Sequence, residues 1–364
     1  MPRLYLRPLH FIESPQLYDG QAERLAGTML WFCSVEIIVK NSEGVTRELV
    51  AVSQFDAAAA RLPEALQGRA KEIFANLASA RVPLSIAERT IRLDQPQVMG
   101  ILNVTPDSFS DGGQTVEADA AIAAAHAMSA AGAAIIDVGG ESTRPGAPLV
   151  WEGDEIKRVE PVITQLANSG TAISIDTRKA AVMEAAHAAG AGMINDISAL
   201  AYDDRAMEAA RCAGVPVALM HAPSQSSDPH KNAVYDNVVT DVYDFLESRI
   251  TAAVAAGIDR NRIVIDPGIG FGKSLADNIA IINNLAIYHG LGCPLLFGAS
   301  RKRMIGALSN EAEADMRLGG SLLLAIKAAE QGAHILRVHD VPQTVQALHV
   351  WRGLRDGALT VPGV

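Results

Sequence analysis

From residue 98 onward, the sequence alternates between short apolar runs and longer alanine-rich stretches of helical periodicity. Continuous apolar strands separated by helices predict a parallel sheet that is buried on both faces. Eight strands are expected, at VMGILNV (98–104), AAIIDVG (133–139), TAISID (171–176), GMINDIS (192–198), PVALMH (216–221), RIVID (262–266), PLLFG (294–298) and HILRVHD (334–340). The helices are expected at 116–131, 152–168, 179–189, 203–213, 235–256, 276–288, 313–330 and 342–354.

Eight strand–helix units between residues 98 and 355 match the roughly 250 residues of an α/β fold of the (β/α)8 type, the TIM barrel. A doubly wound open sheet is the rival fold. It usually has fewer strands and a GxGxxG loop after its first strand. The corresponding loop here reads NVTPDSFSDGG (103–113) and lacks that pattern. The sequence therefore favours a barrel domain over residues 96–364.

Residues 1–95 lie outside this rhythm and are expected to form an N-terminal accessory extension. TMLWFCSVEIIVK, NSEG and VTRELVAV, in succession over residues 28–52, predict a β-hairpin. A helix is expected over 57–80, with Pro63 near its start, and IRLDQP (91–96) is expected to be a strand or linker that enters the barrel. This region carries no catalytic pattern, and its role stays open.

The net charge of −10, from 31 basic and 41 acidic residues, argues against non-specific binding to nucleic acid or anionic membranes. An anionic substrate would need a local basic cluster. The cysteines are three in number, far apart and without metal-ligand spacing, which favours a reducing compartment. The N-terminus has no apolar core of signal-peptide length, and no segment approaches the ~18 apolar residues of a membrane helix. A cytoplasmic protein is expected.

Polar residues follow the end of every predicted strand, where a barrel carries its chemistry. Each has an ordinary alternative, because a strand-end Asp often caps a helix, a His can be structural and a Gly-rich turn is often only a turn. Asp196 in particular is expected to be a cap or a network partner. The coincidence at eight strands predicts a site. The residues are Asn103, GGESTRPGA (139–147), Asp176, Asn195 and Asp196, Met220 and His221, DPGIGFGKS (266–274), GASRKR (298–303), and Arg337, His339 and Asp340.

One group of these side chains is cationic or can become so. Arg337 and His339 are two residues apart on one strand, so both point into the barrel mouth or both point away. Pro342 suits a first helical turn, and a helix N-terminus beside Arg and His predicts a phosphate or pyrophosphate pocket. Arg303 is expected to be a solvated surface charge. The group comprises Arg144, Lys273, Arg301, Lys302, Arg303, Arg337 and His339.

A second group is carboxylate and amide: Asp176, Asn195 and Asp266. A carboxylate accepts two parallel N–H bonds, so these residues suit a heterocycle with an amino-pyrimidine edge. A metal trio is the weaker alternative, because no histidine or second carboxylate stands at ligand spacing on one element. GxSxG is absent and no cysteine sits beside a base, so the sequence argues against a covalent nucleophile.

The motifs NVTPDSFSDGG, GGESTRPGA, SIDT, NDIS, DPGIGFGKS, SRK and RVHD, in this order over about residues 96–355, closely resemble those of the dihydropteroate synthase family of folate biosynthesis. The resemblance implies a transferase that joins 6-hydroxymethyl-7,8-dihydropterin pyrophosphate to 4-aminobenzoate and releases pyrophosphate by an SN1-like displacement. It also implies a TIM barrel that uses Mg²⁺, forms a homodimer, is a sulfonamide target, and has small-molecule partners rather than nucleic acid or membrane.

The resemblance also implies residue roles. Asp176, Lys302, Arg337 and His339 are expected to act in catalysis. The pterin would be bound by Asp176, Asn195, Met220, Asp266 and Lys302. The pyrophosphate would be bound by Asn103, Arg337 and His339, with Asn103 also at the metal. The aminobenzoate would be bound by Phe109, Thr143, Arg144, Pro145, Phe271 and Ser300. Ile269 departs from the pattern, since the family often has an aromatic residue there, and the loop 222–232 has no clear match.

Two other functions predict different motifs. A pterin-binding methyltransferase on a related barrel would hold the ring with Asp and Asn but would lack the STRPG motif and the SRK and RVH anion set. A non-catalytic pterin-binding relative would lose one or more of Asn103, Thr143, Arg337 and His339. All of these residues are present, which favours the synthase.

Overall fold

The computed structural model describes residues 2–13, 15–105, 113–142, 144, 146–223, 229–231 and 233–360. Its main sheet consists of the parallel strands β7 (Gln97–Asn103), β8 (Ile135–Gly139), β9 (Ile173–Asp176), β10 (Met193–Asp196), β11 (Val217–Met220), β12 (Ile263–Asp266), β13 (Leu296–Phe297) and β14 (Ile335–Val338). Their order is β12-β11-β10-β9-β8-β7-β14-β13. A parallel bridge between Ile265 and Leu295 brings the two ends of this sheet together. The predicted TIM barrel is confirmed.

Helices follow the strands as predicted, with three differences. They are α3 (Gly113–Ala130), α4 (Glu152–Asn168), α5 (Ala180–Ala189), α6 (Ala206–Ala213), α7 (Val238–Ala255), α8 (Leu275–Asn283), α9 (Arg303–Leu308), α10 (Leu318–Ala329) and α11 (Val341–Thr360), with short 3-10 turns η4 (Arg260–Arg262), η5 (Leu285–Leu291) and η6 (Ala314–Met316). The helix expected over 276–288 divides at Asn284, whose side chain donates to the carbonyl of Ala280. The helix expected over 313–330 starts only at Leu318, and α9 was not predicted.

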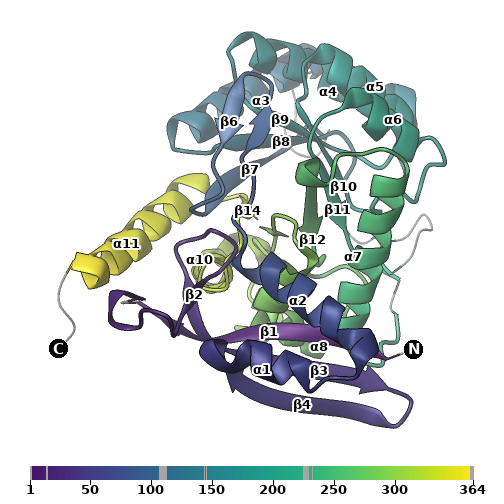
Figure 1. Ribbon diagram of the computed structural model, residues 1–364. Coiled ribbons are helices and arrows are strands. Elements are labelled where there is room, and N and C mark those ends of the chain that lie inside the picture. Colours follow the sequence, from purple (N-terminus) through teal and green to yellow (C-terminus); the bar gives the residue numbers. More distant parts are fainter. Residues whose placement is uncertain are drawn as a thin grey trace.

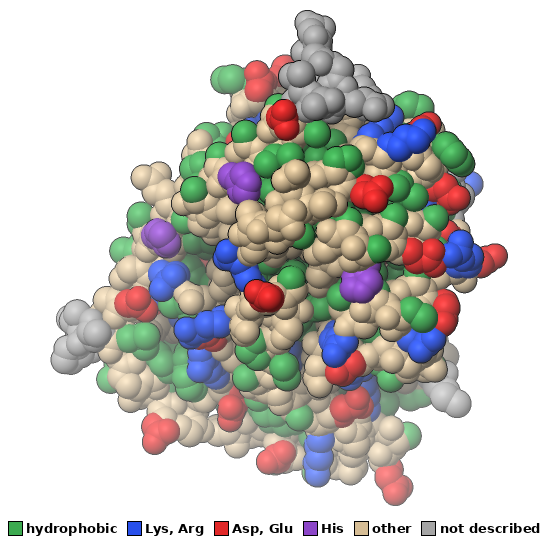
Figure 2. All heavy atoms as spheres, turned by 90° about the horizontal axis from the view of Figure 1, so that it is seen from above, with side chains coloured by type: hydrophobic (Ala, Val, Ile, Leu, Met, Phe, Trp, Pro, Cys, Tyr) green, Lys and Arg blue, Asp and Glu red, His purple; other side chains and the backbone are tan. Residues whose placement is uncertain are grey.

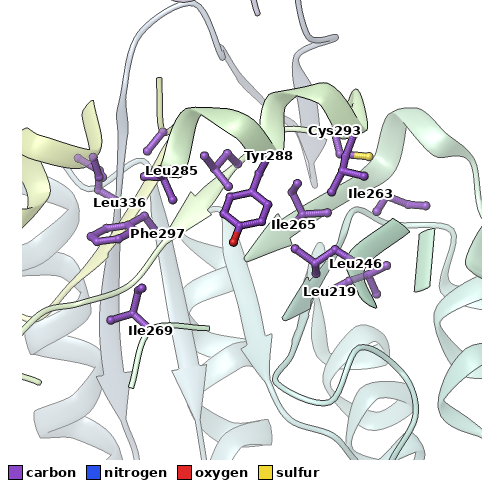
Figure 3. Packing of buried hydrophobic residues seen from close by; sticks show 14 of the residues in the cluster. Leu219, Leu246, Ile263, Ile265, Ile269, Leu285, Tyr288, Cys293, Phe297 and Leu336 are labelled. Carbon is purple, nitrogen blue, oxygen red and sulfur yellow. The ribbon is translucent and has the colours of Figure 1, made fainter. Parts of the chain in front are cut away.

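Alternate side chains of each strand point outward and inward. Outward residues such as Leu219, Ile265 and Phe297 pack against Leu246 of α7 and Tyr288 of η5 (Figure 3). The inward residues nearest the amino-terminal ends form an apolar layer: Met99, Ile135, Ala172, Met193, Ala218, Val264, Leu296 and Ile335. Further along the strands, the next inward positions approach the opposite end of the barrel.

The amino-terminal end of the barrel is closed by a hairpin. β5 (Leu84–Ile86) pairs with β6 (Arg89–Ile91), and Leu84, Ile86, Ile91 and Leu93 all belong to the apolar layer inside the barrel. The sequence predicted only a strand or linker here. The hairpin leaves the carboxyl ends of the strands as the open end, so ligands have to enter there.

Replacing Ile86 with alanine is expected to lower the free energy of unfolding by about 2–5 kcal/mol, because Ile86 is fully buried and the closed barrel leaves little room for repacking. Urea unfolding would measure this change. The neighbouring Ser85 is exposed, so Ser85→Ala serves as the control and should change stability by less than about 0.5 kcal/mol. Equal stability of Ile86→Ala and wild type would show that the hairpin does not close the barrel.

The described residues between Pro2 and Ala80 form an antiparallel sheet and two helices. β3 (Trp31–Asn41) and β4 (Gly44–Ala51) are the predicted hairpin, which is confirmed. β1 (Arg3–Ile12) and the short β2 (Glu23–Arg24) were not predicted, and both pair with β3. The single helix expected over 57–80 is two helices, α1 (Phe55–Ala60) and α2 (Glu64–Ala78), with 3-10 turns η1 (Pro15–Leu17) and η2 (Val52–Gln54) before them. Pro63 separates the helices because it has no N–H to donate within a helix.

This N-terminal layer packs tightly on the barrel, and its strands β1, β3 and β4 lie at the bottom of Figure 1, below α2. The ring of Tyr5 meets Tyr243 edge-on with centroids 5.2 Å apart, and its hydroxyl donates to Asp244 at 3.0 Å. The guanidinium of Arg81 donates to the carbonyls of His289 and Cys293 at 2.9 and 3.3 Å. The layer and the outer shell of the barrel thus share one hydrophobic core.

The surface shows mixed charge on the face in Figure 2, where acidic and basic side chains are interspersed. Cys33, Cys212 and Cys293 are all free thiols. Across the described residues, every helix is too short or too polar to cross a bilayer.

Candidate active site

Arg337 is the centre of a buried cluster at the carboxyl ends of the strands. Its Nε donates to Oδ2 of Asp137 and its terminal nitrogen to Oδ2 of Asp176, both at 2.6 Å. Asn195 donates to the same oxygen of Asp137 at 3.1 Å. Asp266 interacts electrostatically with Arg337 from β12. Five strands that are far apart in the sequence therefore bring inward side chains to one place.

Asp137 was not predicted as a site residue. It is fully buried in the middle of β8, and among the described residues its Oδ1 has no hydrogen-bond partner. The signal was present in the sequence, because AAIIDVG has one carboxylate inside an apolar strand. With Ile135 and Gly139 it lies on the inward side, since side chains alternate along a strand. Asp137 positions both Arg337 and Asn195.

Burial and charge act in opposite directions on this cluster. Burial raises the pKa of Asp176 to about 7, although Arg337 lowers it, and the nearby carboxyl groups raise it further. Burial alone would lower the pKa of Arg337, but Asp137 and Asp176 together raise it above its ordinary value. Arg337 is therefore a permanent cation, while Asp176 changes its charge close to neutral pH.

Lys302 lies beside the carboxylates of Asp266 and Asp176 and packs on the loop after β12. Its ammonium donates to the carbonyl of Ile269 and stands 4.2 Å from the ring centre of Phe271. Gly270 leaves room for the lysine stem, because a Cβ at this position would come within 2.9 Å of Cδ of Lys302. Burial lowers the pKa of Lys302 to about 8, opposed by Asp266.

We expect a bell-shaped pH dependence of kcat/KM, with its maximum between about pH 7 and 8. Binding a heterocycle through Asp176 needs the carboxylate, which is lost below about pH 7, and binding through Lys302 needs the ammonium, which is lost above about pH 8. Activity should fall about tenfold for each pH unit below about pH 6. Initial rates across pH 5–10 would measure the profile. Lys302→Arg should remove the alkaline limb, and a flat profile in wild type would contradict both assignments.

An apolar wall adjoins Lys302. Ile197, Met220, Ala222 and Phe271 form a separate small hydrophobic cluster at this end of the barrel. The ring of His230 stacks on Phe271 with centroids 4.8 Å apart. A flat ring could pack on this wall while its polar edge faces the carboxylates.

The lip beside Arg337 carries His339 and Ser300. Both the main-chain N–H and Nδ1 of His339 lie near Oγ of Ser300, at 3.2 and 3.1 Å. Burial, with the positive charges of Arg337 and Arg301, lowers the pKa of His339 to about 4. His339 is thus neutral at pH 7 and can donate a hydrogen bond, but it does not supply the positive charge considered from the sequence. Arg144 and Arg303 are exposed, the latter as expected.

Two residues from the strand-end motifs serve the loops instead. Asp196 accepts from the N–H and Oγ of Ser198, both at 2.6 Å, and from the N–H of Leu200 at 3.0 Å. This confirms the expectation of a network partner. Lys273 was counted among the cations at the strand ends, but its ammonium is buried inside its own loop, 2.8 Å from the carbonyl of Gly268.

A family model described as "Pterin binding enzyme" matches residues 99–339, which include most of the barrel. The dihydropteroate synthase of Escherichia coli (strain K12) is 46% identical over 262 residues, covering 72% of this chain and 92% of that protein. The chain belongs to the dihydropteroate synthase family.

Solved structures of dihydropteroate synthases match the same fold. The Xanthomonas albilineans synthase with 4-aminobenzoic acid is 48% identical, covers 77% of this chain and 99% of its own, and has a TM-score of 0.72. With 7,8-dihydropteroate, the same synthase is 46% identical, with coverages of 77% and 100% and a TM-score of 0.69. The Yersinia pestis synthase in a sulfonamide complex is 46% identical, with coverages of 76% and 100% and a TM-score of 0.70. The synthase matches disfavour the methyltransferase alternative.

These dihydropteroate synthase structures are covered almost whole, yet about a quarter of this chain lies outside each match. The N-terminal layer precedes the family match, which starts at residue 99. It is therefore an addition to the part shared with the family.

Three residues expected at the aminobenzoate, Phe109, Thr143 and Pro145, lie outside the described residues. Asn103, expected at the pyrophosphate, ends β7 beside Gly139. A Cβ at Gly139 would stand 3.8 Å from both Oδ1 of Asn103 and Oδ2 of Asp176, so two side-chain oxygens border this glycine. Within the described part of the chain, no three His, Cys, Asp or Glu side chains are grouped as metal ligands.

Proposed function

We propose that this protein is a dihydropteroate synthase that joins 6-hydroxymethyl-7,8-dihydropterin pyrophosphate to 4-aminobenzoate and releases pyrophosphate. The observation that carries the proposal is the convergence of Asp176, Asn195 and Asp266 with Lys302 and Arg337 at the open end of the barrel. Asp176, Asn195 and Asp266 form a floor that accepts N–H groups, Lys302 donates beside it, and Arg337 attracts phosphate oxygens. Such a combination fits a substrate with an amino-pyrimidine edge and an anionic leaving group.

The pterin would lie deepest. Asp266 has one oxygen held by the N–H of Gly268 at 2.7 Å, which leaves its other oxygen for the ring edge. Asp176 and Asn195 would bind further polar atoms of the ring, and Lys302 would donate to its carbonyl. Met220, from the apolar wall, would pack on a ring face. These roles rest on the placement of each side chain around one floor.

The pyrophosphate would lie toward the lip, with Arg337 supplying positive charge and His339 a neutral donor. A magnesium ion fits beside Asn103, because Mg²⁺ prefers oxygen ligands and is often held by one or two protein groups together with substrate phosphates. When bound, the ion would neutralise charge on the phosphate oxygens. Asn103 would hold it through its amide oxygen.

The reaction we propose begins with breakage of the bond between the pterin methylene and the pyrophosphate oxygen, whose electron pair leaves with pyrophosphate. Arg337 stabilises the charge that develops on that oxygen. The carboxylate of Asp176 stabilises the positive charge that spreads into the pterin ring. The amine of 4-aminobenzoate then donates its lone pair to the methylene carbon and loses a proton to solvent. A neutral arylamine needs no strong base, which agrees with the lack of a catalytic triad in the sequence.

The aminobenzoate would approach between the apolar wall and the lip. Ser300 and Arg144 follow β13 and β8 and are suited to its carboxylate, and Phe271 to its ring. Phe109, Thr143 and Pro145 are assigned to the same pocket by the family resemblance alone. A sulfonamide, which resembles 4-aminobenzoate in shape, would compete for this pocket.

A direct assay tests the proposal. Purified protein is incubated with the pterin pyrophosphate, 4-aminobenzoate and magnesium, and dihydropteroate and pyrophosphate are quantified. Equal amounts of both products are expected, and sulfonamide should inhibit competitively with 4-aminobenzoate. A folded protein that makes neither product would remove the synthase assignment. Binding of dihydropterin without turnover would favour the non-catalytic alternative.

A homodimer is proposed from the apolar side chains on neighbouring segments at the C-terminal side of the barrel. Leu308, Met316, Leu323, Val350 and Leu354 are between 60% and 75% exposed, on α9, η6, α10 and α11. Exposed apolar groups of this kind often mark protein interfaces. Light scattering should give twice the chain mass, and Leu323→Glu should shift the measured mass toward that of the monomer.

Free cysteines support the predicted cytoplasmic location.

A further inference from the structure

Lys273 has a set of contacts that the proposed reaction does not use. Its side chain is almost completely buried, and its ammonium lies 2.8 Å from Nδ1 of His221. Three carbonyl oxygens surround the same nitrogen: those of Gly268 at 2.8 Å, Phe271 at 3.2 Å and His221 at 3.3 Å. The three N–H groups of the ammonium are shared among these three carbonyls and Nδ1 of His221, which accepts in the tautomer protonated at Nε2, so the ammonium joins two loops that follow different strands.

We propose that Lys273 is a positioning residue for the pterin pocket, acting through the buried contacts of its ammonium with His221 and with the carbonyls of its own loop. This inference rests on the proposed function, because it assigns the pterin to the floor that Lys273 supports. It adds a residue to which neither the family resemblance nor the reaction gives a role.

Each contact of the ammonium leads to a residue of the pocket. The carbonyl of Gly268 belongs to the residue whose N–H holds Asp266 at 2.7 Å. The carbonyl of Phe271 belongs to the same residue whose ring lies beside the ammonium of Lys302. His221 directly follows Met220, and its N–H donates to the carbonyl of Asp266 at 2.9 Å. One buried amine therefore sets the relative positions of Asp266, Lys302 and Met220.

The loop needs such a donor because its backbone folds back on itself. Gly268, Gly270 and Gly272 have φ values of +70°, +81° and +57°, a conformation that favours glycine. A Cβ at Gly268 would collide with the carbonyl of His221, and one at Gly272 with Pro223. Carbonyls that converge in a buried space repel one another and cost stability unless a donor satisfies them. An ammonium provides three donors from one point.

The decisive experiment compares Lys273→Met with wild type in the synthase assay. Methionine keeps much of the packing volume but provides no donor. We expect the KM for the pterin pyrophosphate to rise 10- to 100-fold and the KM for 4-aminobenzoate to change less than threefold. Equilibrium dialysis with dihydropterin should show the same loss of affinity. Lys71→Met, an exposed lysine on α2, is the matched control and should leave both KM values unchanged.

A purely structural role would give a different result, because partial unfolding reduces the active fraction and lowers kcat without changing either KM. An unchanged pterin KM in Lys273→Met would therefore overturn the inference. A wild-type protein without turnover would instead remove the proposed function, so the two failures are distinguishable.

A second variant covers the possibility that Lys273→Met does not fold. His221→Phe keeps an aromatic ring between Phe245 and Tyr235 but removes the acceptor for Lys273. We expect its pterin KM to rise about fivefold with little change for 4-aminobenzoate. The pterin KM of the double variant, Lys273→Met with His221→Phe, should be no more than twofold above that of Lys273→Met alone, because both changes remove the same contact. Independent, multiplicative effects, or an unchanged KM in His221→Phe, would contradict the proposal.

Discussion

Replacing Arg337 with methionine is expected to lower kcat/KM for the pterin pyrophosphate by roughly 10³-fold, the largest effect of any single change proposed for this protein. Arg337 donates to Asp137 and Asp176, so its guanidinium is fixed in position before the leaving group develops charge. Preorganised charge in a water-poor site stabilises a departing anion without reorientation. Rapid-quench measurement of pyrophosphate release would show whether the bond-breaking step is the one that slows.

Arg337→Lys separates charge from geometry. Lysine keeps the positive charge but cannot donate to Asp137 and Asp176 from one planar group. We expect this variant to recover no more than about a tenth of wild-type activity. Full activity in Arg337→Lys would show that the guanidinium geometry is unimportant, and full activity in Arg337→Met would remove Arg337 from the mechanism.

The same substitution has a cost in stability that can be measured apart from activity. Removing Arg337 leaves two buried carboxylates without their cation, and breaking such a pair destabilises a protein by about 3–5 kcal/mol. Adding Asp137→Asn to Arg337→Met should restore part of this loss, because one uncompensated charge is removed. Activity should stay low in the double variant. If the double variant recovered stability and activity together, Arg337 would act only through folding.

The sequence predicted the barrel because its signal is local and repeated eight times. It predicted Asp176, Asn195, Asp266 and Arg337 because each stands at or near the end of an apolar run. Asp137 was missed since it lies within such a run, where a carboxylate has no local partner to mark it. Its partner Arg337 is 200 residues away in the chain, and only the closed barrel brings them together.

The local sequence pattern also does not predict the direction in which a side chain at the end of a strand points. Lys273 and Lys302 are both cationic residues after strands, but the carbonyls of a folded loop enclose the first and the carboxylates of the floor attract the second. His339 could be charged in a solvated site, yet burial beside Arg337 keeps it neutral. These outcomes depend on burial and on distant charges, which have no sequence period.

In the N-terminal layer, the sequence predicts the hairpin of β3 and β4 because a turn signal stands between two apolar strands. β1 has no neighbouring partner in sequence, since it pairs with β3 across the intervening residues 13–30. The division of the expected helix into α1 and α2 follows from Pro63, which has no N–H to donate within a helix. The pairing of β1 with β3 is long-range and has no local signal.

Asp266 and Asp196 provide the second test, because both are buried carboxylates at strand ends and only one belongs to the proposed pterin floor. Asp266→Asn is expected to raise the KM for the pterin pyrophosphate about 100-fold. The asparagine oxygen can still accept from Gly268, so the loop is kept while the charge that binds the ring edge is lost. A hydrogen bond to a charged group contributes about 1.5–3 kcal/mol, which is in keeping with a 100-fold effect.

Asp196→Asn is the matched control. Asp196 uses both oxygens on Ser198 and Leu200, and an amide can accept on only one side. We expect the free energy of unfolding to fall by about 1–3 kcal/mol, with the pterin KM within threefold of wild type. Isothermal titration with dihydropterin and urea unfolding on both variants would separate binding from stability. If Asp196→Asn weakened pterin binding as much as Asp266→Asn, the floor would have to include β10's last residue, and the distinction between a binding carboxylate and a loop-holding one would fail.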